Sequence, residues 1–271
     1  KGKHMITNEK AIRTLVKTAV ESYSEGFETR HVSEKDDLDG TINMKIHNVF
    51  IAALGPEIQY YTALVRSLDS SLGNMLEKLA INIALLFYQV FKNVQGPLYP
   101  KQTQIIAEIL ESYKSHAKKP SVIDYSELRK IKESGPATNK RHDSDYYLID
   151  QKSGNHYLIE LKIGGDLDNK KARSEKEAIL EQYAILSNTL DSETNIKIYF
   201  ATAYNRFGEG KPWKQERVKQ FFANEELLIG KDFWNFICKS NDGYFTVLDE
   251  YKKHADIILK SLERIKKVYL G

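Results

Sequence analysis

The fold is decided by the stretch Asp145-Tyr-Tyr-Leu-Ile-Asp150, a short turn, and then His156-Tyr-Leu-Ile-Glu160-Leu-Lys162. Tyrosine and isoleucine are favoured in strands, so two such runs joined by a turn predict a β-hairpin. Glu160 and Lys162 are two residues apart on a strand, so their side chains project from the same face. The hairpin therefore carries carboxylates and a lysine close together.

The register of this hairpin determines which acids meet. If the turn consists of residues 151–154, Asp145 lies directly opposite Glu160, and their Cβ atoms are about 5 Å apart. Two unpartnered carboxylates at that distance repel, whereas a divalent cation between them makes the interaction favourable. Lys162 can orient or polarise a water molecule activated by the metal. The pattern is typical of a magnesium-dependent phosphodiesterase site and indicates a nuclease.

The apolar surroundings of these charges make the pattern more specific. Glu-x-Lys alone is common and mostly marks the solvated face of an edge strand. Here the neighbouring residues are apolar on both faces of the strand, and charges in such a setting are costly unless they are paired or metal-bound. Magnesium prefers carboxylate oxygens and retains several waters, so two protein carboxylates suffice. We therefore expect Asp145 and Glu160 to bind Mg2+ and Lys162 to position the water.

Three other acidic residues are relevant to the site. Asp143 has the same parity as Asp145 but would face Lys162, so Asp145 is the preferred ligand and Asp143 the alternative. Asp150 lies by the turn and is expected to be solvated. Glu77 interrupts an apolar helix, and Gly73 shares its helix face, which would let another backbone or the hairpin approach. We expect Glu77 to assist as an auxiliary metal ligand or lysine partner; the alternative is a solvated helix-surface glutamate.

The composition is that of an ordinary globular protein. The chain has 271 residues, 41% of them hydrophobic and 28% charged, which allows one large domain or two small ones. A net charge of +3 argues against a polycation that coats nucleic acid, but it is compatible with a basic groove balanced by acids elsewhere. Cys238 is the only cysteine, which favours a cytoplasmic setting. No apolar run or leader pattern suggests a membrane, and residues 1–4 look like an expression remnant.

Periodicity along the chain predicts a helical first half followed by a mixed second half. Helical spacing covers residues 8–23, 43–53, 59–68, 70–92, 103–116, 173–190, 214–223, 231–239 and 248–268. Residues 28–41 and 133–137 are expected to be loops, residues 122–125 a strand or a turn, and residues 195–204 a central strand. We expect one domain over residues 5–271. Within it, residues 5–118 are mainly helical, 120–205 form the catalytic core, and 206–271 form a C-terminal helical and recognition part.

Two loops carry candidate DNA contacts. After the Glu160 strand, Asp168 or Asn169 could cap a helix or lie beside the metal, and the cations that follow could meet phosphates or stay solvated. The loop around Trp213 combines glycines with basic and amide side chains suited to phosphate and base-edge contact. Its alternative is a structural loop with Trp213 on the core. The candidate DNA-binding residues are Lys170, Lys171, Lys211, Lys214, Gln215 and Arg217.

The hairpin resembles the PD-(D/E)xK nuclease superfamily, whose motif is an acid on one strand and Glu/Asp-x-Lys on the next. Asp145 takes the first place, Glu160-Leu-Lys162 the second, and Ser144 stands where a proline often precedes the acid. The segment 71–77 resembles the helix that precedes the core in many type II restriction endonucleases. Segments 160–169, 208–213 and 228–236 look more narrowly like the TdeIII-type enzymes, a similarity covering about residues 70–236.

The resemblance implies an α/β (α+β) fold of the restriction-endonuclease-like class, with a central mixed β-sheet flanked by helices. It further implies a homodimer that cuts both strands of double-stranded DNA at a short, GGNCC-like site. A cognate DNA methyltransferase would be its functional partner, without a stable complex. The alternatives are a DNA repair or junction-resolving nuclease of the same superfamily, and a DNA-binding relative that has lost catalysis.

Overall fold

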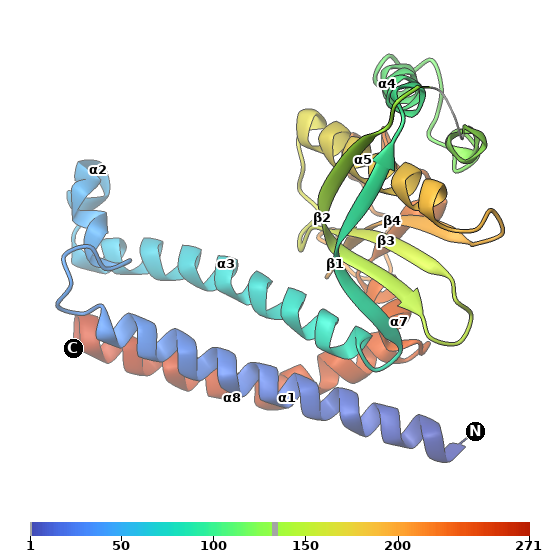
Figure 1. Cartoon of the computed structure of the whole chain (residues 1–271). Coiled ribbons are helices and arrows are strands. Elements are labelled where there is room, and N and C mark those ends of the chain that lie inside the picture. Colours follow the sequence, from blue (N-terminus) through green and yellow to red (C-terminus); the bar gives the residue numbers. More distant parts are fainter. Residues whose placement is uncertain (1, 132–134) are drawn as a thin grey trace. The chain divides into compact units, whose positions relative to one another are not determined.

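The computed structural model describes residues 2–131 and 135–271, which form two compact units (Figure 1). The helical unit combines the chain up to Ile83 with Phe245–Gly271, and the sheet unit is Ala84–Tyr244. Lys1 and residues 132–134, two of which belong to the expected loop over 133–137, lie outside the described residues. The expectation of a single domain over residues 5–271 stays a prediction.

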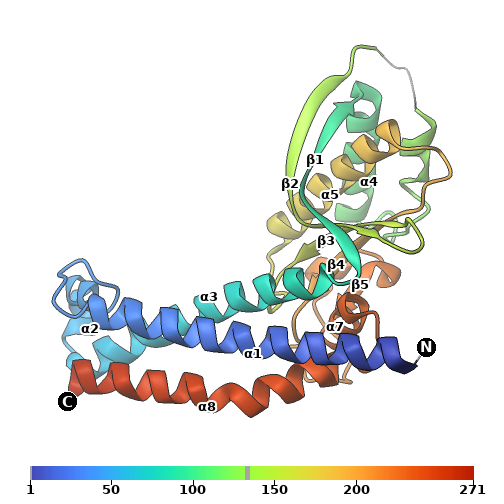
Figure 2. The same ribbon diagram turned by 60° about the horizontal axis from the view of Figure 1, so that its bottom comes forward.

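Three long helices make up most of the helical unit: α1 (Gly2–Ser33), α3 (Pro56–Ala84) and α8 (Gly243–Leu270). They lie side by side in both views (Figure 1, Figure 2). Ion pairs Arg13–Asp249 and Glu28–Arg264 show that α1 and α8 run parallel. Between α1 and α3 lie the 3-10 helix η1 (Asn43–His47) and the one-turn helix α2 (Val49–Ala52). The hydrophobic core of the helical unit includes Phe27, Ile42, Tyr60, Leu64 and Ile265.

The boundaries of the first half differ from the sequence prediction. Helix α1 extends to Ser33, into the expected loop, and the two helices expected over 59–68 and 70–92 are one helix that ends at Ala84. Residues 88–98 form strand β1 (Tyr88–Leu98), so the helical prediction was wrong over residues 88–92. The physical reason is long-range: β1 pairs with a strand some fifty residues later, from Tyr88↔Asp150 to Leu98↔Thr138. A short apolar run does not distinguish a strand from a buried helix.

A five-stranded mixed sheet organises the sheet unit, with strand order β1-β2-β3-β4-β5. The other strands are β2 (Thr138–Asp150), β3 (His156–Leu161), β4 (Ile196–Thr202) and β5 (Leu227–Ile229). β1, β2 and β3 pair antiparallel, whereas β3, β4 and β5 pair parallel. The predicted hairpin and the predicted strand over 195–204 are confirmed.

Helices flank this sheet on both faces. The helices and 3-10 turns of the unit are α4 (Pro100–Lys114), η2 (Ser126–Lys130), α5 (Asn169–Thr189), α6 (Glu216–Lys219), η3 (Asn224–Glu226) and α7 (Lys231–Cys238). α5 and α4 share a core with Tyr147, Leu158 and Phe200 on one sheet face. Successive side chains of a strand point to opposite faces of the sheet, so Tyr157 lies on the other face from Leu158. There Phe236 of α7 packs against Tyr157. The predicted mixed sheet flanked by helices is confirmed, although the helix over 214–223 shrinks to one turn and residues 122–125 form a turn.

A buried charged cluster, which the sequence did not reveal, ties α5 to η3. Lys176 is fully buried, and its Nζ contacts both carboxylate oxygens of Glu226 at 2.6 and 2.7 Å. Tyr125 Oη and the backbone N–H of Ala223 donate to the same carboxylate. This buried cluster joins segments fifty residues apart. No described helix is long and apolar enough to cross a membrane.

Candidate active site

The register of the β2–β3 hairpin is the one predicted from the sequence. Tyr146 pairs with Ile159 and Ile149 with His156, and the Asp150 N–H donates to the Asn155 carbonyl at 2.9 Å. The turn therefore consists of residues 151–154 and ends in Gly154, whose φ of 68° favours glycine. Continued by one residue, this ladder places Asp145 opposite Glu160.

The two carboxylates lie on the α5 side of the sheet. The facing pair Tyr147 and Leu158 contributes to the core beneath α5. Asp145 and Glu160 are two residues further along the same face, at the edge of that core. Glu160 is 13% exposed, so its carboxylate is held close to apolar groups.

The position of Asp145 distinguishes it from Asp143. One carboxylate oxygen of Asp145 accepts a hydrogen bond from the Leu161 backbone N–H at 2.9 Å, which orients the side chain toward the β3 strand. The Asp143 side chain is 91% exposed and lies beside Arg141 at 3.9 Å. The geometry therefore favours Asp145 as the partner of Glu160, as the sequence analysis preferred.

Burial and the neighbouring charges determine the electrostatics of this site. Burial, together with the charge of Asp145, raises the pKa of Glu160 to about 8. Burial disfavours the Lys162 ammonium, but Glu160 and Glu175 outweigh it, so the pKa of Lys162 lies above its ordinary value. A divalent cation between the two carboxylates would favour the ionised form of both.

Glu175 of α5 is a site residue that the sequence analysis missed. The Lys162 ammonium pairs with Glu160 and also with Glu175 Oε1 at 3.2 Å. Glu175 thus holds the lysine from the helix side while Glu160 holds it from the strand. Glu175 stands at helical spacing between Ala172 and Ile179, both of which are buried. This spacing could have indicated that Glu175 lies on the inner face of the helix.

The glycines after Lys162 allow the strand to turn away sharply. The Lys162 N–H still donates to Ala201 of β4 at 3.0 Å, which fixes the lysine backbone. Gly165 has a φ of 67°, and a Cβ there would lie 2.7 Å from Thr202 Cγ2 and 3.0 Å from Trp213. Asp168 then caps α5 by accepting from the Lys171 N–H, so the predicted capping role is confirmed.

The candidate DNA contacts fall into two groups on the sheet unit. Lys170 and Lys171 are exposed in the first turn of α5, and Lys211, Lys214 and Arg217 are exposed after β4. Gln215 is already engaged, because its amide donates to Asp166 at 3.0 Å. Arg206 pairs with the same aspartate at 2.8 Å, which joins the turn after β3 to the loop after β4. Trp213 is buried and packs against Phe200, so the alternative of a structural loop with Trp213 on the core is correct for that residue.

Asp150 and Glu77 are the remaining acids for which the sequence predicted a position or a role. Asp150 is buried, so the expectation that it is solvated was wrong: it pairs with Lys239 and accepts from the Lys152 and Ser153 N–H groups. Burial alone would raise the pKa of Asp150, but these partners hold it below its ordinary value. Glu77 lies on α3 of the helical unit, whereas the other three candidates belong to the sheet unit, and its role stays a prediction.

The side chains at this site could hold a magnesium ion, but they do not form a site in which protein ligands surround the metal completely. Within residues 2–131 and 135–271, no group of three or more His, Cys, Asp or Glu side chains is placed to hold a metal. Two facing carboxylates, one with a raised pKa, offer hard oxygen ligands and leave room for water and phosphate oxygens. The residues present therefore fit Mg2+.

The five-stranded mixed sheet flanked by helices is consistent with a restriction-endonuclease-like α+β fold. Residues 8–255 match the family described as type II restriction endonuclease, HinfI. The chain belongs to this family of site-specific deoxyribonucleases, whose members act on double-stranded DNA. No curated protein and no solved structure matches it.

Proposed function

We propose that this family member hydrolyses DNA phosphodiester bonds with Mg2+ at a short specific site, through a PD-(D/E)xK arrangement. The observation that carries the proposal is the hairpin register, which places Asp145 opposite Glu160 with Lys162 on the same face. Structural ion pairs do not require two facing acids at the edge of a core. A metal-dependent phosphodiesterase can use them to hold its cation.

Each residue has a role that follows from its surroundings. Asp145 and Glu160 would hold Mg2+, which when bound stabilises negative charge on the scissile phosphate. Lys162 stays an ammonium at neutral pH because its pKa is raised, so it donates hydrogen bonds to water or to a phosphate oxygen and takes no proton. Glu160 and Glu175 orient that ammonium. Glu77 is proposed to assist, as an auxiliary ligand or a partner of the lysine.

The finer properties are proposals as well. The proposed site is a single hairpin in each chain, and cutting both strands of a duplex then takes two copies, so we propose a homodimer. The TdeIII-type resemblance suggests a GGNCC-like target, while the family that matches is HinfI. An enzyme that cuts a short site also endangers the DNA of its own cell, so a cognate methyltransferase is proposed as functional partner, acting in the same cytoplasmic compartment.

Digestion of a sequenced plasmid tests the function directly. With magnesium or manganese, the protein should give discrete fragments whose ends share one short sequence; calcium should allow binding with little turnover. Addition of EDTA should abolish cleavage, because the two carboxylates cannot stabilise phosphate charge by themselves.

Three results would contradict the proposal. Undiminished cutting in EDTA would exclude the metal mechanism. Cutting only at lesions or junctions would favour a repair or junction-resolving nuclease. Binding without cutting under any metal would favour a DNA-binding relative without catalysis.

The cations of the loop after β4 lead to a separate prediction about DNA recognition. If Lys211 holds a phosphate, Lys211→Ala should weaken binding to every DNA sequence and lower the salt slope by about one. If Arg217 contacts a base, Arg217→Ala should relax discrimination at one position by roughly 1–3 kcal/mol. Binding is measured by anisotropy in calcium, with Lys197→Ala, an exposed cation on β4, as the control. If both variants behave like the control, the loop is structural and recognition lies elsewhere.

A further inference from the structure

Two adjoining pockets form a groove in the helical unit, lined by α1, α3 and the segment from Asp39 to Asn48. Their volumes are about 580 and 480 Å³. They share Arg30, Ser71 and Asn74, so the groove is continuous. We call it the α1–α3 groove.

The polar part of the α1–α3 groove lining is basic and rich in hydrogen-bond donors, and apolar side chains such as Phe27, Met75 and Leu79 line the second pocket as well. Its cations are Arg30, Lys45, Arg66 and Lys78, and Asp39 is the carboxylate among its lining residues. Asparagine amides and serine and threonine hydroxyls make up most of the remaining polar lining. Cations interleaved with amide and hydroxyl donors are the side chains that contact phosphate and sugar in protein–DNA complexes.

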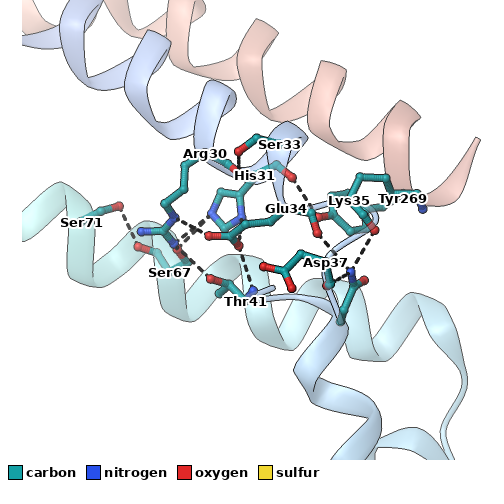
Figure 3. Close-up of polar contacts among 11 residues, drawn as sticks. Arg30, His31, Ser33, Glu34, Lys35, Asp37, Thr41, Ser67, Ser71 and Tyr269 are labelled. Carbon is teal, nitrogen blue, oxygen red and sulfur yellow. Dashed lines mark hydrogen bonds and ion pairs between the residues drawn. The ribbon is translucent and has the colours of Figure 1, made fainter. Parts of the chain in front are cut away.

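Arg30, at the junction of the two pockets, is held in place by a polar network (Figure 3). Its Nη2 donates to Ser67 Oγ at 2.7 Å, and its Nε lies 3.5 Å from Glu34. Glu34 in turn accepts from the Thr41 N–H at 2.8 Å. His31 is buried and contacts Ser67 at 3.0 Å, and burial lowers the pKa of His31, so it orients the hydroxyl without adding charge. The guanidinium is therefore positioned before any ligand arrives.

The other three cations are not neutralised by protein groups. Within the parts of the chain that the structure describes, Lys45, Arg66 and Lys78 form no ion pair, whereas many surface cations of α1 and α8 do. Arg66 and Lys78 are twelve residues apart on α3, about 18 Å along the helix axis. That span covers several phosphates of one DNA strand, which advance about 3.4 Å each.

We propose that the α1–α3 groove binds the sugar–phosphate backbone of double-stranded DNA. The inference rests on the proposed function and adds to it a contact surface in the helical unit, apart from the catalytic hairpin. Such a contact neutralises phosphates and releases counterions, so it strengthens binding to any sequence and depends steeply on salt. It holds the duplex without reading bases.

The test is the double variant Lys45→Ala/Arg66→Ala, because neither side chain has an ion-pair partner among the described residues whose loss would disturb the fold. Binding of a short fluorescent duplex carrying the mapped site, and of a scrambled duplex, is measured in calcium across a salt series. Both affinities should fall by a similar factor, about tenfold or more, and the salt slope should fall by about two.

The matched control is Lys252→Ala/Lys267→Ala on α8, which removes the same charge from exposed positions outside the groove. Thermal melting verifies that both double variants are folded. The inference is overturned if the groove variant keeps the wild-type salt slope, or if the control loses as much affinity. A wild-type protein that neither binds nor cuts duplex DNA would instead refute the proposed function itself.

Discussion

Asp145→Ala should lower DNA cleavage by a factor on the order of 10³ or more, equivalent to about 4 kcal/mol of transition-state stabilisation. The reason is that Asp145 supplies one of the two facing carboxylates, and Glu160 alone cannot hold the metal. Asp143→Ala should retain most of the activity, because the Asp143 side chain is exposed and lies outside the pair. Rates are compared under single-turnover conditions at saturating Mg2+.

Asp145→Asn separates charge from folding. The asparagine oxygen can still accept from the Leu161 N–H, so the hairpin end is preserved while the negative charge is lost. We expect it to be as inactive as the alanine variant and to melt near the wild-type temperature. If Asp143→Ala is inactive and Asp145→Asn is active, the metal ligand lies two residues earlier than we assign it.

Glu226→Ala should cost about 3–5 kcal/mol of unfolding free energy, the largest stability effect that we expect from a single substitution. It would leave the Lys176 ammonium fully buried without its carboxylate, and the Tyr125 hydroxyl and Ala223 N–H without an acceptor. Urea denaturation at neutral pH measures the change. Tyr125→Phe removes one hydrogen bond from the same cluster and should cost about 1 kcal/mol.

Two further variants test whether the loss of stability comes from the buried charge. Lys176→Met/Glu226→Leu removes both charges and should recover much of the loss, because an apolar pair of similar size avoids the desolvation penalty. Asp256→Ala breaks the exposed pair with Lys260 on α8 and should hardly shift the denaturation midpoint. A Glu226→Ala variant as stable as the Asp256→Ala variant would show that the buried cluster contributes nothing to stability.

The sequence by itself determined the features that depend on local pattern. The β2–β3 hairpin follows from strand-forming residues on both sides of a four-residue turn, and a one-residue slip would move every side chain to the wrong face. That is why the pairing of Asp145 with Glu160 could be predicted. α5 and β4 were also recognisable, because helical and strand spacing are visible within one element.

Only the tertiary structure decided the features that join distant segments. Whether residues 88–98 are helix or strand depends on their ladder with β2, some fifty residues later. The partner of Asp150 is Lys239, 89 residues away, and that of Lys176 is Glu226. Glu175 meets Lys162 because the glycine turn folds α5 back over β3. The sequence specifies each side chain and its local spacing, but which charges meet in a core depends on how the elements pack.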